Sequence, residues 1–181
     1  MRPAAFLDRD GVINLDHGYL YRWEDFEFVP GSVDALRRLQ AAGYALVIVT
    51  NQSGIARGYY DEAALQALHD ALRHHLASQG ITLAAIEYCP HLPDGTVARY
   101  AIDCDCRKPA PGMILRSAQA LGIDLAASLM FGDKTSDIEA AERAGVGRAV
   151  LLATDANPAA AKGRNPEFTS LADAVDALLH A

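Results

Sequence analysis

Two carboxylates stand one residue apart near the start of the chain. Asp8 and Asp10 follow the short apolar run 4–7, and Gly11 comes directly after them. In a strand, residues two positions apart project from the same face, and glycine lets the backbone turn sharply. Two carboxylates this close repel each other unless a cation lies between them or one stays protonated. The triplet fits a hard-metal site, a nucleophile with an acid/base partner, or both, but also solvated acids at the end of a strand.

Further polar clusters follow other apolar runs. Asp133 comes directly after one of them, and its carboxylate, with Asp8 and a carbonyl of the first loop, would supply the oxygen ligands that Mg²⁺ prefers. Thr50 offers a hydroxyl and leads a polar loop in which Ser53, Gly54 and backbone N–H groups could hold phosphate oxygens. Three such clusters in one chain favour a shared site over three unrelated strand ends.

Arg107 and Lys108 add two positive charges just before Pro109. A phosphoryl group held between Mg²⁺, Lys108 and backbone N–H groups would be neutralised on several sides, which is most of what phosphoryl transfer requires. A carboxylate can attack phosphorus to form an aspartyl-phosphate, and a second acid can protonate the leaving oxygen and later activate water. We therefore predict a Mg²⁺-dependent phosphoryl-transfer site.

The cysteines point to a second metal. All three lie close together, and with one histidine they form the set Cys89, His91, Cys104 and Cys106, with twelve residues between His91 and Cys104. An odd number of cysteines does not suggest a disulfide framework, whereas four such ligands suit a closed tetrahedral Zn²⁺ site. A closed site leaves no open position for a reaction, so the zinc is expected to be structural and to fix the loop that ends at Arg107 and Lys108.

Alternating strands and helices are predicted to position these groups. Strands are expected at 4–7, 45–49, 83–88, 128–131 and 148–152. Helices are expected from a Ser32 cap to Gly43, from Asp61 to Gly80, from Pro111 to Gly122, after Asp133 to Gly145, and after a Ser170 cap; 14–30, 89–109 and 153–166 are expected to be loops. This pattern predicts an α/β fold with a doubly wound, Rossmann-like parallel sheet, in which ligands bind beyond the carboxyl ends of the strands.

Composition limits the class of protein. The 181 residues are expected to form a single domain, 1–181, and no apolar run approaches the roughly 20 residues of a membrane span. A net charge of −7 argues against a nucleic-acid surface. We expect a cytoplasmic monomer that acts on a small molecule, with no nucleic-acid or membrane partner.

These residues carry a resemblance to the haloacid-dehalogenase (HAD) phosphohydrolases, in the order of that family's four motifs. The matching stretches are Asp8-x-Asp10-Gly11, Thr50-Asn51, Lys108-Pro109 and Gly132-Asp133-Lys134-x-x-Asp137. The resemblance implies a sheet order of 3-2-1-4-5, with Asp8 as nucleophile and Asp10 as general acid/base. It also implies that Thr50 and Lys108 steady the phosphoryl group.

The same resemblance implies a Mg²⁺ site made by Asp8, the Asp10 carbonyl and Asp133, with Lys134 and Asp137 adjacent. The segments between motifs are too short for a large cap domain, so loops are expected to select the substrate. The stretches 8–19, 50–58, 88–91 and 104–112 resemble the zinc-loop subgroup that includes heptose-bisphosphate phosphatases. The resemblance to heptose-bisphosphate phosphatases implies removal of the C7 phosphate of D-glycero-D-manno-heptose 1,7-bisphosphate, a step in lipopolysaccharide precursor synthesis.

The subgroup resemblance implies a set of substrate contacts in three stretches of the chain. They are Asp16, His17, Gly18 and Tyr19; Thr50, Asn51, Gln52 and Ser53; and Arg107 and Lys108. The planar fork of Arg107 suits a second phosphate or sugar oxygens. The remaining histidines, His69, His74, His75 and His180, are expected to be solvated.

Three alternatives stay open. Histidinol-phosphate phosphatases share the HAD motifs and the zinc loop, and their chemistry would be identical. A non-catalytic phosphosugar-binding module is a second alternative, although binding alone does not require an acid/base such as Asp10. A polynucleotide end phosphatase is the third, and the acidic charge balance disfavours it.

Overall fold

Five parallel strands form the centre of the computed structural model, which describes residues 1–153 and 165–180. The strands are β1 (Ala4–Leu7), β2 (Ala45–Asn51), β3 (Leu83–Cys89), β4 (Leu129–Gly132) and β5 (Arg148–Leu151). The helices are α1 (Ser32–Ala41), α2 (Glu62–Ser78), α3 (Gly112–Leu121), α4 (Thr135–Ala144) and α5 (Leu171–Leu179), with short 3-10 turns η1 (Trp23–Asp25) and η2 (Ala98–Tyr100). The sheet order is β3-β2-β1-β4-β5, which confirms the predicted fold class and order.

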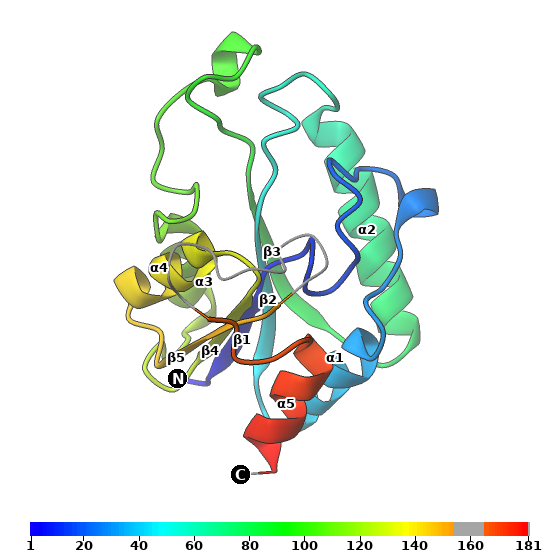
Figure 1. Ribbon diagram of the computed structural model, residues 1–181, viewed down its shortest axis with the longest axis vertical. Coiled ribbons are helices and arrows are strands. Elements are labelled where there is room, and N and C mark those ends of the chain that lie inside the picture. The colour runs from blue at the N-terminus through cyan, green and yellow to red at the C-terminus, as the bar shows by residue number, and fades with distance from the viewer. Residues whose placement is uncertain (154–164, 181) are drawn as a thin grey trace.

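Strict alternation along β1 and β2 divides the core into two layers. Ala5 and Leu7 of β1 pack on one face, whereas Ala4 and Phe6 pack on the other, and both faces are buried. Continuous apolar strands of this kind belong to parallel sheets covered on both sides. Figure 1 shows α1 and α5 lying side by side across one face and α3 and α4 on the opposite side.

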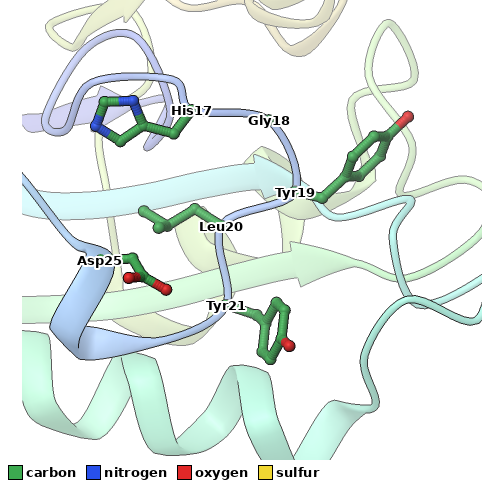
Figure 2. Close-up of a pocket in the computed structure, with 6 residues that line it drawn as sticks. All are labelled: His17, Gly18, Tyr19, Leu20, Tyr21 and Asp25. Carbon is green, nitrogen blue, oxygen red and sulfur yellow. The ribbon is translucent and has the colours of Figure 1, made fainter.

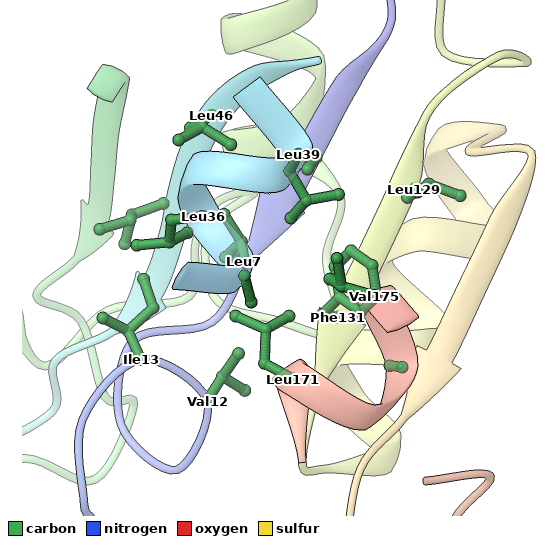
Figure 3. Packing of buried hydrophobic residues seen from close by; sticks show 14 of the residues in the cluster. Leu7, Val12, Ile13, Leu36, Leu39, Leu46, Leu129, Phe131, Leu171 and Val175 are labelled. Atoms are coloured by element: carbon green, nitrogen blue, oxygen red, sulfur yellow. The ribbon is translucent and has the colours of Figure 1, made fainter. Parts of the chain in front are cut away.

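The layer beneath α1 and α5 is made mainly of branched aliphatic side chains. Leu36 and Leu39 of α1 and Leu171 and Val175 of α5 converge on Leu7 and its neighbours in the sheet (Figure 3). Each fully buried Leu or Val contributes roughly 1.5–3 kcal/mol by removal from water. This packing fixes the sheet, and the polar clusters lie at the carboxyl ends of its strands.

Most helix ends follow the predicted signals. The Asp61 carboxylate accepts a hydrogen bond from Ala64 N at 2.8 Å, and the Ser170 hydroxyl accepts one from Asp173 N at 3.1 Å, so both predicted caps are confirmed. The predicted Ser32 cap is wrong. Gly31, with φ of 80°, precedes α1, and the buried Ser32 hydroxyl donates instead to the Ile13 carbonyl at 3.0 Å.

The connections carry the remaining differences. β2 extends two residues further than predicted, through Thr50 and Asn51, because these residues still pair with β3. The predicted loops 14–30 and 89–109 each contain a 3-10 turn, η1 and η2. Of the predicted loop 153–166, only positions 153, 165 and 166 lie within the described residues. None of the described helices combines the length and the apolarity that crossing a membrane requires.

Candidate active site

Lys108 lies at the centre of the site, buried between two carboxylates. Its ammonium donates to Asp8 Oδ1 at 2.9 Å and to the Val49 carbonyl at 2.7 Å, and lies 2.6 Å from Asp137 Oδ1. Asp8 directly follows β1, and its N–H donates to the Phe131 carbonyl of β4. Burial disfavours the charge on Lys108, but Asp137 and Asp8 outweigh burial and raise the pKa of Lys108. The ammonium is therefore a fixed positive charge beside Asp8.

Asp133 completes an oxygen-rich cluster at the same edge of the sheet. Carboxylate oxygens of Asp8, Asp133 and Asp137 all lie within 4.8 Å of one another. Burial, and then repulsion by Asp8, raise the pKa of Asp133 to about 8. A divalent cation would offset that repulsion, and three buried carboxylates offer the hard oxygen donors that Mg²⁺ prefers.

Two glycines allow the carboxylates to approach the backbone this closely. A Cβ on Gly11 would lie 2.4 Å from Asp133 Oδ2, and a Cβ on Gly132 would lie 2.2 Å from the Cβ of Asp137. Gly11 also has φ of +88°, a conformation that side chains rarely adopt. The donor set and the cradle around it therefore fit a bound Mg²⁺.

Asp10 lies outside this carboxylate cluster and has its own partners. The Arg9 guanidinium donates to both Asp10 oxygens, at 2.9 and 3.1 Å, and Asn14 Nδ2 and Gln52 Nε2 donate at 2.9 and 3.0 Å. Burial alone would raise the pKa of Asp10, but the Arg9 charge and these hydrogen bonds lower it. The Asp10 carboxylate is thus held ionised, outside the cluster formed by Asp8, Asp133 and Asp137.

Arg9 and His69 are two buried polar residues that the sequence analysis missed. Arg9 is fully buried; its Nη2 donates to the Leu20 carbonyl at 2.8 Å, and its Nη1 lies 3.2 Å from His69 Nε2. The prediction that His69 is solvated is wrong, because α2 turns this side chain into the interior, where it is 2% exposed. The available signal was the helical spacing of His69 with Leu65, Leu72 and Leu76.

Asn51 and Gln52 are turned toward protein partners. Asn51 Nδ2 donates to the Lys108 carbonyl at 3.1 Å, and Asn51 Oδ1 accepts from Lys108 N at 3.0 Å, so this amide fixes the backbone of Lys108. Gln52 Nε2 donates to the buried Thr50 hydroxyl at 3.0 Å as well as to Asp10. The structure brings both residues to the site, with their amides already hydrogen-bonded.

A pocket of about 320 Å³ opens beside these groups. It contains most of the predicted substrate contacts; its lining residues are Asp10, Asp16, Gly18, Tyr19, Asn51, Gln52, Ser53, Tyr60 and Lys134. His17 lines a neighbouring pocket of about 480 Å³, in which Tyr19 and Tyr21 project on one side of the loop and His17 on the other (Figure 2). Arg107 lines neither pocket, and its Nη1 donates to the His91 carbonyl at 3.4 Å.

The cysteine-rich loop brings the four predicted zinc ligands together. Cys106 Sγ lies 2.9 Å from Cys89 Sγ and 3.3 Å from Cys104 Sγ, and His91 Nδ1 lies 3.3 Å from Cys106 Sγ. The four ligand atoms lie within 4.8 Å of one another, and all three cysteines are free thiols. Three sulfurs and one imidazole nitrogen in this grouping are the donor set of a closed zinc site.

The comparisons with known proteins agree with this arrangement. A sequence profile described as haloacid dehalogenase-like hydrolase matches residues 4–145, which include Asp8, Thr50, Lys108 and Asp133. The chain belongs to the haloacid dehalogenase-like hydrolases. As expected for such a hydrolase, its motif residues gather at the carboxyl ends of β1, β2 and β4.

Named relatives of this hydrolase chain are similar over almost its whole length. D-glycero-beta-D-manno-heptose-1,7-bisphosphate 7-phosphatase from Photorhabdus laumondii is 49% identical over 173 residues, covering 94% of this chain and 92% of the relative. The protein of the same name from Escherichia coli K12 is 48% identical over 178 residues, covering 97% and 93%. A crystal structure of D,D-heptose 1,7-bisphosphate phosphatase from B. bronchiseptica with magnesium and phosphate is 37% identical, covers 98% of both chains and has a TM-score of 0.83.

Proposed function

We propose that this hydrolase is a Mg²⁺-dependent phosphomonoesterase that removes the C7 phosphate of D-glycero-D-manno-heptose 1,7-bisphosphate in the cytoplasm, during synthesis of lipopolysaccharide precursors. The observation that carries the proposal is the buried Asp8–Lys108–Asp137 cluster, with Asp133 beside it, at the edge of the sheet. The choice of this substrate is supported by the similarity to relatives named heptose-1,7-bisphosphate 7-phosphatase, which are 48–49% identical to this chain.

Asp8 is the nucleophile in this proposal. One of its carboxylate oxygens attacks phosphorus, the bond from phosphorus to the sugar oxygen breaks, and an aspartyl-phosphate forms on Asp8. The leaving sugar oxygen takes a proton from Asp10 and departs as an alcohol. In the second half, Asp10 removes a proton from water, whose oxygen attacks the same phosphorus and releases phosphate and free Asp8.

The partners of Asp10 suit both duties. Arg9, Asn14 and Gln52 hold its carboxylate in one place and favour the ionised form, which is the base needed for the water. A bound phosphate brings negative charge close to Asp10 and favours the protonated form, which is the acid needed for the sugar oxygen. The same residue can therefore serve both half-reactions.

Asp8, Asp133 and the Asp10 carbonyl would hold the Mg²⁺, with Lys134 and Asp137 adjacent. When bound, the ion neutralises charge on the phosphoryl oxygens. Lys108 and Thr50 steady the phosphoryl group, and Asp137 orients Lys108 through the contact at 2.6 Å. Asp16, His17, Gly18, Tyr19, Ser53 and Arg107 are proposed to contact the sugar or its second phosphate, and Zn²⁺ on Cys89, His91, Cys104 and Cys106 is proposed to be structural.

Phosphate release tests this proposal. We expect kcat/KM for heptose 1,7-bisphosphate to exceed that for histidinol phosphate, with turnover lost on removal of Mg²⁺. A preference for histidinol phosphate would assign the alternative substrate, and failure to hydrolyse any phosphomonoester would leave only a binding module.

The Asp8→Asn variant should lose turnover by roughly three orders of magnitude or more, because an amide is a poor nucleophile. Activity near that of the unmodified protein would refute the role of Asp8.

A further inference from the structure

The side chain of Gln52 is fully engaged inside the protein. A glutamine amide has two N–H donors and one carbonyl acceptor. Gln52 Nε2 donates to Asp10 Oδ2 and to Thr50 Oγ1, each at 3.0 Å, and Gln52 Oε1 accepts from the Tyr60 hydroxyl at 2.5 Å. The residue is 3% exposed. Its amide therefore serves other side chains of the site.

The orientation of the Gln52 amide decides whether an N–H donor or a carbonyl acceptor faces the Asp10 carboxylate. As it stands, an N–H group points at the Asp10 carboxylate, which is a favourable contact between donor and acceptor. A flipped amide would place the carbonyl oxygen there, and two acceptors would face each other across a buried gap, which is unfavourable. The Asp10 carboxylate can only accept, so it selects the first orientation, and the Tyr60 hydroxyl anchors the amide there by donating to Oε1.

Tyr60 is itself fixed on two sides. Its ring stacks on that of Tyr21, with centroids 5.0 Å apart and planes 15° apart. Gly54 lies directly against the ring as well, since a Cβ added at Gly54 would come within 2.2 Å of Tyr60 Cε1. Tyr60 also directly precedes Asp61, the cap of α2. The hydroxyl is therefore held at a defined point beside Gln52.

We propose that Tyr60 is a positioning residue: by fixing the amide of Gln52, it aims the Asp10 carboxylate for proton transfer to the leaving oxygen. The proposal rests on the proposed phosphatase function. Arg9 and Asn14 also hold Asp10, so loss of the Tyr60 hydroxyl removes part of the support. The Tyr60 hydroxyl donates to Gln52, so its effect on Asp10 passes through that amide.

Leaving-group dependence separates this role from a general effect on folding. An alkyl phosphate such as heptose bisphosphate needs a proton on its leaving oxygen, whereas p-nitrophenyl phosphate has a leaving group that departs with little help. Tyr60→Phe keeps the ring and removes only the hydroxyl. We expect its kcat/KM for heptose bisphosphate to fall about three- to tenfold, and that for p-nitrophenyl phosphate less than about twofold, in line with one hydrogen bond.

Tyr59→Phe is the matched control. Tyr59 is the neighbouring tyrosine and is 55% exposed, and its hydroxyl makes no hydrogen bond to any residue in 1–153 or 165–180. It should leave the ratio of the two kcat/KM values unchanged. An equal loss on both substrates in Tyr60→Phe, or no loss on heptose bisphosphate, would overturn the proposal.

A second measurement does not depend on turnover. In ¹⁵N-labelled protein, the side-chain N–H signals of Gln52 are identified by their absence in Gln52→Glu. We expect these protons to exchange with solvent at least about tenfold faster in Tyr60→Phe than in the unmodified protein or Tyr59→Phe, since the amide is no longer fixed. Unchanged exchange would refute the positioning role, whereas an unmodified protein that hydrolyses no phosphomonoester would refute only the proposed function.

Discussion

The guanidinium of Arg9 is a buried positive charge whose contacts come from three parts of the chain. It donates to Asp10, to the Leu20 carbonyl and to His69 Nε2. A guanidinium carries only donors, so His69 has to accept through an unprotonated nitrogen. Burial, and then the Arg9 charge, lower the pKa of His69 to about 3. His69 is therefore neutral at physiological pH.

This neutral histidine predicts a pH dependence of stability. His69 has a pKa of about 6.5 when unfolded and about 3 when folded, so as pH falls below 6.5 the unfolded chain takes up a proton that the folded chain does not. The contribution of neutral His69 to stability is fully present above pH 6.5 and is lost progressively as the pH falls from 6.5 toward 3. Between pH 8 and pH 5, this group should remove about 2 kcal/mol from the free energy of unfolding.

The check is urea unfolding at both pH values. His69→Gln keeps an acceptor but cannot titrate, so its free energy of unfolding should fall by about 2 kcal/mol less than that of the unmodified protein between pH 8 and pH 5. His74→Gln, at an exposed position on the same helix, serves as the control. Identical pH dependence in all three proteins would contradict a buried neutral His69.

The sequence indicated some of these side chains and not others. Asp8 and Asp133 end apolar runs, and parallel strands bring such ends together, so their proximity follows from the fold class. The burial of Arg9 depends on His69, sixty residues away, and adjacent charges such as Arg9 and Asp10 are ordinarily solvated. A single sequence carries no sign of that distant partner.

Among the elements, the turn after β1 passes close to a carboxylate of the site. Gly11 combines φ of +88° with a backbone that passes close to Asp133. Gly11→Ala should cost roughly 1–2 kcal/mol for the backbone conformation alone, and more for the clash with Asp133. We expect lower stability in urea and a loss of Mg²⁺-dependent turnover, because the alanine methyl group displaces the Asp133 carboxylate.

Gly43→Ala is the matched control for this turn. Gly43 has φ of +94°, yet nothing lies within 4 Å of its would-be Cβ. It therefore carries the conformational cost without the clash, and its turnover should match that of the unmodified protein. If Gly11→Ala and Gly43→Ala were equally stable and active, the close approach to Asp133 would have no consequence.

The loop between β3 and α3 is expected to depend on its cysteines, through the proposed zinc, for order. It reaches far beyond the sheet in Figure 1, and its Tyr100 hydroxyl donates to Glu62 of α2 at 2.6 Å. The Tyr88 hydroxyl, near the end of β3, donates to the same carboxylate at 2.7 Å. Cys104→Ser should lose zinc, as measured by metal analysis, and should lower the melting temperature. KM should rise, since Arg107 and Lys108 follow this loop. Zinc retained at one ion per chain would refute the proposed ligand set.

Element boundaries were predicted where a local signal decides them. Asp61 and Ser170 cap their helices as expected, because each side chain reaches an N–H in the next turn. Ser32 does not, because Gly31 occupies the cap position and Ser32 is the first residue of α1, where its hydroxyl donates to the Ile13 carbonyl. That contact depends on how the first loop folds back over α1, which local sequence does not specify.

At the scale of the whole molecule, one ion should stabilise the entire fold. Asp8, Asp133 and Asp137 follow different strands or lie on α4, so Mg²⁺ bound to the native state raises the free energy of global unfolding, by about 2.7 kcal/mol at a hundredfold excess over Kd. Mg²⁺ should raise the melting temperature of the unmodified protein. Asp133→Asn should abolish that shift, whereas Asp94→Asn, at an exposed position, should keep it. A full shift in Asp133→Asn would exclude Asp133 as a ligand.

The family resemblance predicted the order of the strands, whereas the alternation of strands and helices predicted the parallel sheet. Apolar strands separated by helices limit the fold to doubly wound sheets, but several strand orders satisfy that pattern. The observed order places β1 at the centre, between β2 and β4. With β1 between β2 and β4, the residues at the carboxyl ends of these three strands come together at one pocket.

The three hydrogen-bonding directions of the Lys108 ammonium are all occupied, by Asp8, Asp137 and the Val49 carbonyl. An incoming anion must therefore compete with Asp8 for the same ammonium. While that contact lasts, one oxygen lone pair of Asp8, the proposed nucleophile, is masked, and a neutral water molecule is a weak competitor for the ammonium. If Asp8 is the nucleophile, we expect an arriving phosphate group to loosen this contact and so to unmask the oxygen that the resting protein keeps bound.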